Sequence, residues 1–189
     1  CSVLPGGPII CCTGSLPAPD PQQYSSMMSL HILFLILLLC LPACLMAGEL
    51  QRYESLLQAP ALSLPDLGGK TRNLTDYRGQ VLLVNFWASW CPPCIQEMPA
   101  MQRLQDRLAG KAFSILAVNV GESAGTVWKF LGKVKVDFTL LRDSDGQTAR
   151  EWEVTTYPTS FLIDRTGTVR YLAHGAVKWD APEMVRIIE

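Results

Sequence analysis

Two nearly continuous apolar stretches lie in the middle of the chain, VLLVNFW at 81–87 and FSILAVNV at 113–120. Apolar runs of this length are typical of β-strands that are buried on both faces of a sheet. Between them, hydrophobic residues recur at helical spacing and a glycine ends the pattern: Ile95, Met98, Met101, Leu104, Leu108 and Gly110. The pattern predicts a strand–helix–strand unit whose two strands are parallel.

The segments around this unit alternate between shorter strands and helices. Residues 61–74 read as a β-hairpin that turns at a Gly-Gly pair. Asp180 and Glu183 flank a proline in the arrangement of a capping box, which predicts a last helix. The remaining expected elements are a helix near 127–134, a strand at 137–143, a helix at 147–154, a hairpin at 159–175 and a final helix from 181, inside which the sequence stops. Together they predict an α/β fold, a mixed β-sheet covered by helices on both faces with an N-terminal β-hairpin extension.

The first quarter of the chain reads as a leader. An unbroken apolar run at Ile32–Leu41 has the length of a signal-peptide core, in a segment that could also serve as a membrane anchor. The tetrapeptide LPAC matches a lipobox as well, which would make Cys44 a lipidated N-terminus. All three interpretations predict export to the periplasm or to the outer face of the cytoplasmic membrane. The predicted boundaries are 1–26 for upstream or non-native sequence, 27–47 for the signal peptide or anchor, 48–60 for a linker and 61–189 for the folded domain.

Charge and histidine content narrow the function classes. The chain carries 16 Lys and Arg against 17 Asp and Glu, a formal net charge of −1, with no run of basic residues. We therefore expect no nucleic-acid partner, because binding phosphate requires a basic surface. The two histidines, His31 and His174, leave little from which to build a His-rich metal site.

The placement of the cysteines indicates redox chemistry and not a disulfide framework. Five of the seven cysteines lie at or before Cys44, and only Cys91 and Cys94 follow. These two form a Cys-Pro-Pro-Cys motif between the first buried strand and the following helix. A Cys-x-x-Cys at this point of an α/β unit is typical of thiol–disulfide exchange. We expect no cofactor beyond the Cys91–Cys94 disulfide itself.

The motif predicts different roles for its two thiols. Cys91 precedes the helix, where unpaired N–H groups and the helix dipole favour a thiolate, so we expect it to be the nucleophile. Cys94 lies one turn on, where it can attack a mixed disulfide at Cys91 and release the product. Pro92 and Pro93 have no N–H group to donate to the thiolate. We therefore expect a moderately stabilised thiolate and a reducing couple.

Three further positions complete the candidate site. Glu97, one helical turn after Cys94, is either an exposed helix residue or a buried base that activates Cys94, and its apolar neighbours favour the base. Pro158 precedes an apolar strand, either as an ordinary trans proline or in a cis bond. A cis Tyr157–Pro158 loop facing the dithiol would bind an extended substrate segment. Trp90, directly before Cys91, is expected at the rim of the same site.

These motifs resemble the TlpA/ResA-like thiol–disulfide oxidoreductases of the thioredoxin superfamily, over roughly residues 60–189. The combination of VLLVNFWASWCPPCIQEMP with YPTSFLID carries the resemblance. Asn85 and Glu97 match the family's replacement of a buried thioredoxin Asp by a Glu after the second Cys, and 123–136 matches its extra helix region. The resemblance implies a thioredoxin-like fold, exported substrate proteins with disulfides or mixed disulfides, and an upstream reductant protein.

Two positions depart from the family pattern. Thr156 stands where the family usually has Gly, and Thr159 stands where members that act in cytochrome c maturation tend to have Glu. The specific assignment to cytochrome c maturation is weaker for that reason.

Two other functions would use the same cysteines. A copper carrier could bind Cu(I) with two thiolates, whereas structural zinc normally takes four ligands and no second cysteine pair follows. The Pro-Pro spacer and Pro158 favour exchange over metal carriage, so we expect no metal site. A peroxiredoxin-like peroxidase would have Thr or Ser three residues before its reactive Cys and Pro four residues further back. Ala88 and Val84 occupy those positions, which argues against peroxide reduction.

Overall fold

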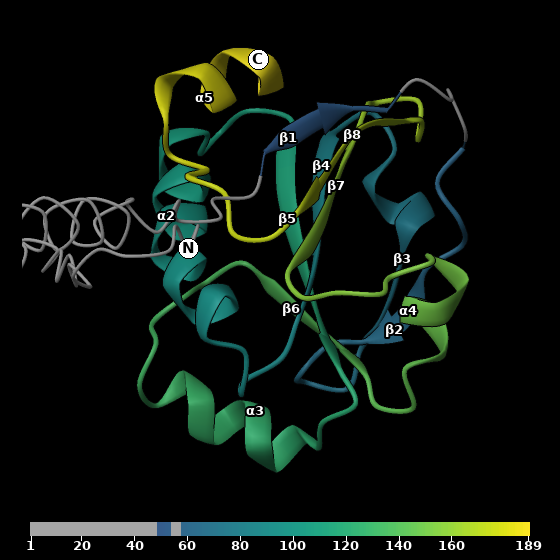
Figure 1. Ribbon diagram of the computed structural model, residues 1–189. Coiled ribbons are helices and arrows are strands. Elements are labelled where there is room, and N and C mark those ends of the chain that lie inside the picture. The colour runs from purple at the N-terminus through teal and green to yellow at the C-terminus, as the bar shows by residue number, and fades with distance from the viewer. Residues whose placement is uncertain (1–48, 54–57) are drawn as a thin grey trace, which may run out of the picture. The chain divides into compact units, whose positions relative to one another are not determined.

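The computed structural model describes residues 49–53 and 58–189, and these form a mixed β-sheet with helices packed on it (Figure 1). The sheet has six strands in the order β1-β8-β7-β4-β5-β6. The strands are β1 (Leu50–Arg52), β4 (Val81–Trp87), β5 (Phe113–Val120), β6 (Thr139–Asp143), β7 (Thr159–Ile163) and β8 (Val169–His174). The order places the apolar strands β4 and β5 in the interior of the sheet, as their composition predicts.

Strand directions follow from the connections between the strands. β4, β5 and β6 are parallel, and helices join them. β7 runs antiparallel to β4, and β8 antiparallel to β7, because a short turn joins these two strands. A separate hairpin of β2 (Ser63–Pro65) and β3 (Thr71–Asn73) precedes β4 and is followed by the 3₁₀ helix η1 (Leu74–Tyr77).

The helices cover both faces of the sheet, as predicted. They are α2 (Pro92–Arg107), α3 (Ala124–Leu131), α4 (Gln147–Glu151) and α5 (Pro182–Ile188). One hydrophobic core joins α2, α3 and α5 to one face through residues such as Leu83, Met101 and Ile115. The other core joins α4 and the β2–β3 hairpin to the opposite face through Phe86 and Trp152, and Figure 1 shows this division. Alternate side chains of β4 therefore enter different cores.

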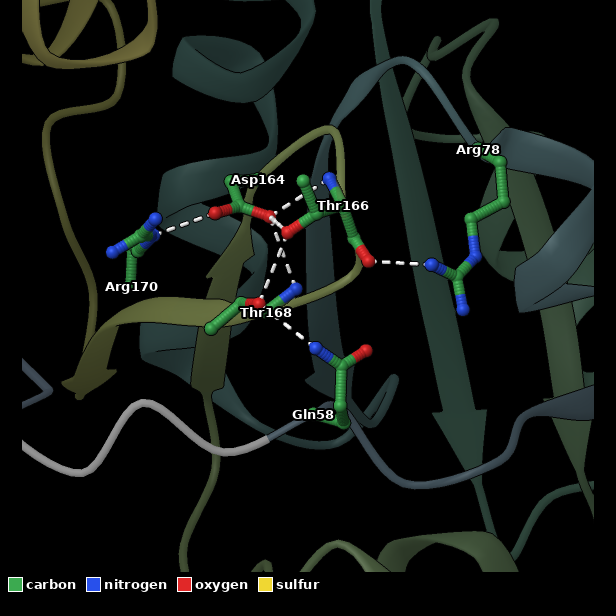
Figure 2. Close-up of polar contacts among 6 residues, drawn as sticks. All are labelled: Gln58, Arg78, Asp164, Thr166, Thr168 and Arg170. Atoms are coloured by element: carbon green, nitrogen blue, oxygen red, sulfur yellow. Dashed lines mark hydrogen bonds and ion pairs between the residues drawn. The ribbon is translucent and has the colours of Figure 1, made fainter.

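A single carboxylate organises the β7–β8 turn (Figure 2). Oδ1 of Asp164 accepts hydrogen bonds from the Thr166 N–H at 2.9 Å, the Thr166 hydroxyl at 2.6 Å and the Thr168 N–H at 3.0 Å. Oδ2 accepts a 2.6 Å bond from Nε of Arg170. Burial raises the pKa of Asp164, but these bonds outweigh burial and lower the pKa to about 2. The turn therefore depends on an ionised carboxylate.

The same turn is bound to two segments that precede β4 (Figure 2). Gln58 donates a 3.0 Å bond from Nε2 to the Thr168 hydroxyl, and Arg78 donates to the Thr166 carbonyl. Gly167 has φ of 86°, in the left-handed region that glycine adopts readily. The turn thus connects the β7–β8 hairpin to the start of the domain.

Two details of the sequence predictions were wrong, one at the start of the domain and one at the start of the last helix. Residues 50–52 fall in the predicted linker but form β1, because an edge strand can pair through its backbone with β8 without an apolar pattern of its own. The capping box at Asp180 and Glu183 does not form. The N-cap of α5 is Ala181, without a side-chain cap bond, and Asp180 instead pairs with Nε of Arg103 at 2.7 Å.

The predicted leader, including Cys44, lies outside the described residues. Within 49–53 and 58–189, no helix is long and apolar enough to cross a membrane.

Candidate active site

The two cysteines lie where β4 gives way to α2. A short loop follows Trp87, Cys91 is the N-cap of α2, and Pro92 and Pro93 open the helix, where a missing N–H costs no helical hydrogen bond. Cys91 and Cys94 form a disulfide with an S–S distance of 2.11 Å and a Cα–Cα distance of 5.3 Å. The Cys94 N–H donates a 3.3 Å hydrogen bond to Sγ of Cys91. The sequence prediction of a dithiol at a helix N-terminus thus corresponds to the observed geometry.

Glu97 points inward from α2 and is only 3% exposed. Its Oε1 accepts a 2.7 Å bond from Nδ2 of Asn85. Its Oε2 accepts a 3.1 Å bond from the Val177 N–H and a 3.3 Å bond from Nε1 of Trp179. Burial raises the pKa of Glu97 to about 7, although all three hydrogen bonds act to lower it. The sequence left open whether Glu97 is exposed or buried, and the structure shows a buried carboxyl.

Asn85 connects this carboxyl to the neighbouring strand. Its Nδ2 also donates a 2.9 Å bond to the hydroxyl of Ser160 on β7, and both residues are fully buried. No sequence pattern indicated Ser160, Val177 or Trp179, because each lies at least 75 residues from its partner in the chain. The polar atom of Asn85 within an otherwise apolar strand was the one signal that pointed to this cluster.

A second loop, which ends where β7 begins, carries Tyr157 and Pro158. The Tyr157–Pro158 peptide bond is cis, which resolves the choice left by the sequence. The Pro158 carbonyl accepts a 2.8 Å bond from the Gly175 N–H, which holds the loop to the end of β8. The rings of Tyr157 and Trp90 meet edge to face with centroids 6.0 Å apart, and Trp90 is 67% exposed. Two of the predicted rim residues, Tyr157 and Trp90, therefore lie together, and Trp90 directly precedes Cys91.

The site has few groups that could bind a metal. In the described part of the chain, no three His, Cys, Asp or Glu residues are grouped as metal ligands. The chemistry that this arrangement supports is exchange at one cysteine pair with a buried carboxyl one helical turn away.

The fold and the site together define a thioredoxin-fold protein with a redox-active cysteine pair. The model of the AhpC/TSA family matches residues 57–172. The thiol-disulfide oxidoreductase ResA of Geobacillus thermodenitrificans is 40% identical over 119 residues, 63% of this chain and 68% of that protein. The thioredoxin-like protein YneN of Bacillus subtilis is 38% identical over 64% of this chain and 71% of its own length.

Solved structures agree with these relatives. A thiol:disulfide interchange protein of the thioredoxin family from Chlorobium tepidum has a TM-score of 0.63 and 26% identity, covering 72% of this chain and 98% of that one. StoA from Bacillus subtilis has a TM-score of 0.60 and 25% identity, covering 69% and 98%. The chain therefore belongs to the AhpC/TSA family and to the ResA-like thiol–disulfide oxidoreductases.

Proposed function

We propose that the protein is an exported protein-disulfide reductase that uses Cys91 as nucleophile, Cys94 as resolving thiol and Glu97 as proton acceptor. Thiol–disulfide exchange itself follows from the cysteine pair and the relatives. The direction of the reaction, the role of Glu97 and the exported location are the proposal. The observation that carries it is the burial of Glu97, whose pKa of about 7 suits a group that accepts and returns a proton near neutral pH.

The reaction balances as two successive exchanges. The Cys91 thiolate attacks a substrate disulfide, forms a mixed disulfide and releases one substrate thiolate. Cys94 then gives its proton to Glu97, and its thiolate attacks Sγ of Cys91. The second substrate thiolate leaves and the Cys91–Cys94 disulfide forms, so two electrons pass to the substrate. A reductant protein with its own dithiol returns the pair to the reduced state.

A base is needed because Cys94 lies in a closed environment. The side chain is fully buried, and a thiol in apolar surroundings holds its proton more tightly than one in water. Glu97 is one helical turn further along the same helix, and Asn85, Val177 and Trp179 hold its carboxylate in place. The carboxylate is thus positioned before the proton has to move.

The reducing direction is supported by the donors that the nucleophile lacks. Pro92 and Pro93 provide no N–H, so Cys94 N–H is the hydrogen-bond donor to Sγ of Cys91 in the described residues. A weakly stabilised thiolate makes the dithiol less stable relative to the disulfide, which corresponds to a low potential. Substrates would be exported proteins with disulfides or mixed disulfides, which bind across Trp90, Tyr157 and Pro158.

The proposal is tested by two measurements on the protein. Equilibration with glutathione and dithiothreitol buffers gives the potential, and we expect a reversible two-electron couple below the glutathione range. Cys94→Ser should accumulate a mixed disulfide with a substrate protein, whereas Cys91→Ser should not. A potential near that of strong oxidants would contradict the reducing direction. Failure of Cys94→Ser to trap substrate would contradict the assigned roles.

Membership of the AhpC/TSA family makes peroxide the rival oxidant to exclude. Ala88 and Val84 replace the residues that a peroxidatic cysteine requires, so we expect hydrogen peroxide to oxidise Cys91 no faster than a free thiol. Copper carriage, the other alternative, would appear as Cu(I) retained by the reduced protein in the presence of a competing chelator.

A further inference from the structure

A second carboxylate binds the loop that carries the nucleophile. Oε2 of Glu122 accepts a 2.7 Å hydrogen bond from the Ser89 backbone N–H, and Oε1 accepts a 2.6 Å bond from the Ser89 hydroxyl. Ser89 lies shortly before Cys91, whereas Glu122 is 33 residues away from Ser89 in the chain. Two bonds to one carboxylate define both the position and the direction of Ser89, and bonds to a charged acceptor are stronger than neutral ones.

Glu122 is itself held by the sheet. Asn119, a fully buried residue of β5, donates a 2.7 Å bond from Nδ2 to Oε2 of Glu122. Gly121, directly before Glu122, donates its N–H to the Asp143 carbonyl at the end of β6, at 2.9 Å. The carboxylate is therefore anchored to two parallel strands, and the rigidity of the sheet extends through it to Ser89.

The loop between β4 and α2 has few other hydrogen bonds, although Ala88 and Cys91 are buried and Trp90 packs against Tyr157. One turn bond of 3.2 Å joins the Cys91 N–H to the Ala88 carbonyl. In the part of the chain that the structure describes, Glu122 is the one residue outside the loop that hydrogen-bonds to Ser89. This contact therefore holds the loop that leads into Cys91, whose carbonyl and Sγ accept hydrogen bonds from the N–H groups of Ile95 and Cys94.

We infer that Glu122 is a positioning residue for Cys91, which by holding Ser89 keeps the nucleophilic sulfur at the place where it pairs with Cys94. The inference rests on the thiol–disulfide exchange proposed above and adds a residue outside the Cys-Pro-Pro-Cys motif. Without the contact, Cys91 samples more positions, so the effective concentration of one thiol at the other falls. The equilibrium then shifts from the disulfide toward the dithiol.

The charge of Glu122 and its contact with Ser89 shift the equilibrium between disulfide and dithiol in the same direction. A carboxylate bound to the nucleophile's own loop opposes a negative charge on Cys91. Removing that carboxylate stabilises the thiolate, and a more stable thiolate also favours the dithiol. Both effects therefore predict a less reducing protein when Glu122 is replaced.

Three variants separate the geometry from the charge. Glu122→Ala removes both the contact with Ser89 and the charge. Glu122→Gln removes the charge, while its amide can still bind Ser89. Ser89→Ala removes the hydroxyl bond and keeps the charge. The measurements are the exchange equilibrium constant against glutathione and the thiolate fraction of Cys91, followed by ultraviolet absorbance against pH. We expect Glu122→Ala to shift the constant about tenfold toward the dithiol, about 30 mV for a two-electron couple. Ser89→Ala should shift it less, in the same direction, and Glu122→Gln should mainly raise the thiolate fraction.

Glu183→Gln is the matched control, because it removes one carboxylate from α5, which has no hydrogen bond to the loop. Its constant should stay within about twofold of the wild-type value. A reversible wild-type couple tests the proposed function separately. If the wild-type couple is reversible, exchange equilibrium constants for Glu122→Ala and Ser89→Ala that both stay within about twofold of the wild-type value would overturn the inference. This holds even where these variants unfold at lower temperature. If Glu122→Ala does not fold, Ser89→Ala decides by the same criterion.

Discussion

Asn85 on the central strand donates a 2.7 Å hydrogen bond to Glu97 on the helix that follows the dithiol. The Oδ1 atom of the same amide is buried and has no hydrogen-bond partner among the described residues. An amide that rotates by half a turn offers this oxygen in place of its N–H. Asn85 can therefore donate to Glu97 when it is a carboxylate and accept from it when it is a carboxylic acid. Such a partner suits a group that gains and loses a proton in each cycle.

Replacing Glu97 should slow the resolving step. Glu97→Gln keeps the size of the side chain but cannot accept the Cys94 proton, and general bases contribute about 10²–10⁴-fold to such steps. In the wild type the rate should rise with pH as Glu97 ionises around pH 7, and the variant should lose this rise. Stopped-flow absorbance measures the rate of the resolving step, as the release of a coloured aromatic thiol from a preformed mixed disulfide at Cys91. A variant with an unchanged pH profile would remove Glu97 from the mechanism.

The raised pKa of Glu97 also predicts how stability depends on pH. The ordinary value is 4.5 and the value in the fold is about 7, so the folded protein holds this proton more tightly than the unfolded chain does. The free energy of unfolding therefore falls as the pH rises from about 4.5 to 7, by about 3 kcal/mol. Urea unfolding of the oxidised protein at pH 5 and pH 8 should show a larger loss for the wild type than for Glu97→Gln. Equal losses would mean that Glu97 is not buried as a carboxylic acid.

Trp90 should affect protein substrates and leave the chemistry of the cysteines unchanged. Its side chain is 67% exposed and contacts Tyr157 at the rim of the site. Trp90→Ala should raise KM for a protein disulfide by about tenfold, since exposed aromatic anchors contribute about 1–2 kcal/mol to binding. The rate with a small disulfide should stay the same. Trp128→Ala is the control, because that side chain is 55% exposed on α3, and an equal effect of both variants would argue against a specific site at Trp90.

The β7–β8 turn should depend on the charge of Asp164. Asp164→Asn leaves Arg170 without its ion pair and weakens the bonds to Thr166 and Thr168, so it should lower the free energy of unfolding at pH 7 by about 1–3 kcal/mol. Because the pKa of Asp164 is lowered to about 2, its charge contributes its full share of the free energy of unfolding above the ordinary pKa of 3.8. It disappears as the pH falls from about 4 to 2.

The difference in unfolding free energy between wild type and Asp164→Asn should therefore be smaller at pH 3 than at pH 7. Asp180→Asn removes an exposed ion pair with Arg103 and should cost less than about 1 kcal/mol. A pH-independent cost of Asp164→Asn would show that the carboxylate contributes through shape and not through charge.

Local sequence patterns predicted the elements that carry the cysteines. The apolar run at 81–87 and the helical spacing after Cys94 correspond to β4 and α2, because both patterns arise from neighbours that share one face of one element. Edge strand β1 was missed because its pairing with β8 uses backbone groups that have no side-chain pattern. The capping box at Asp180 and Glu183 was wrong because Arg103, which is distant in the chain, pairs with Asp180.

The sequence by itself determined the positions of the two cysteines, the proline spacer and the acid one turn further on, since their spacing is local to one helix. The tertiary structure alone decided the state of that acid. Glu97 is buried and bound by groups 12, 80 and 82 residues away, so its pKa depends on how the sheet and the final loop close around it. The contact of Ser89 with Glu122 has the same origin, because it forms only when β4 and β5 lie side by side.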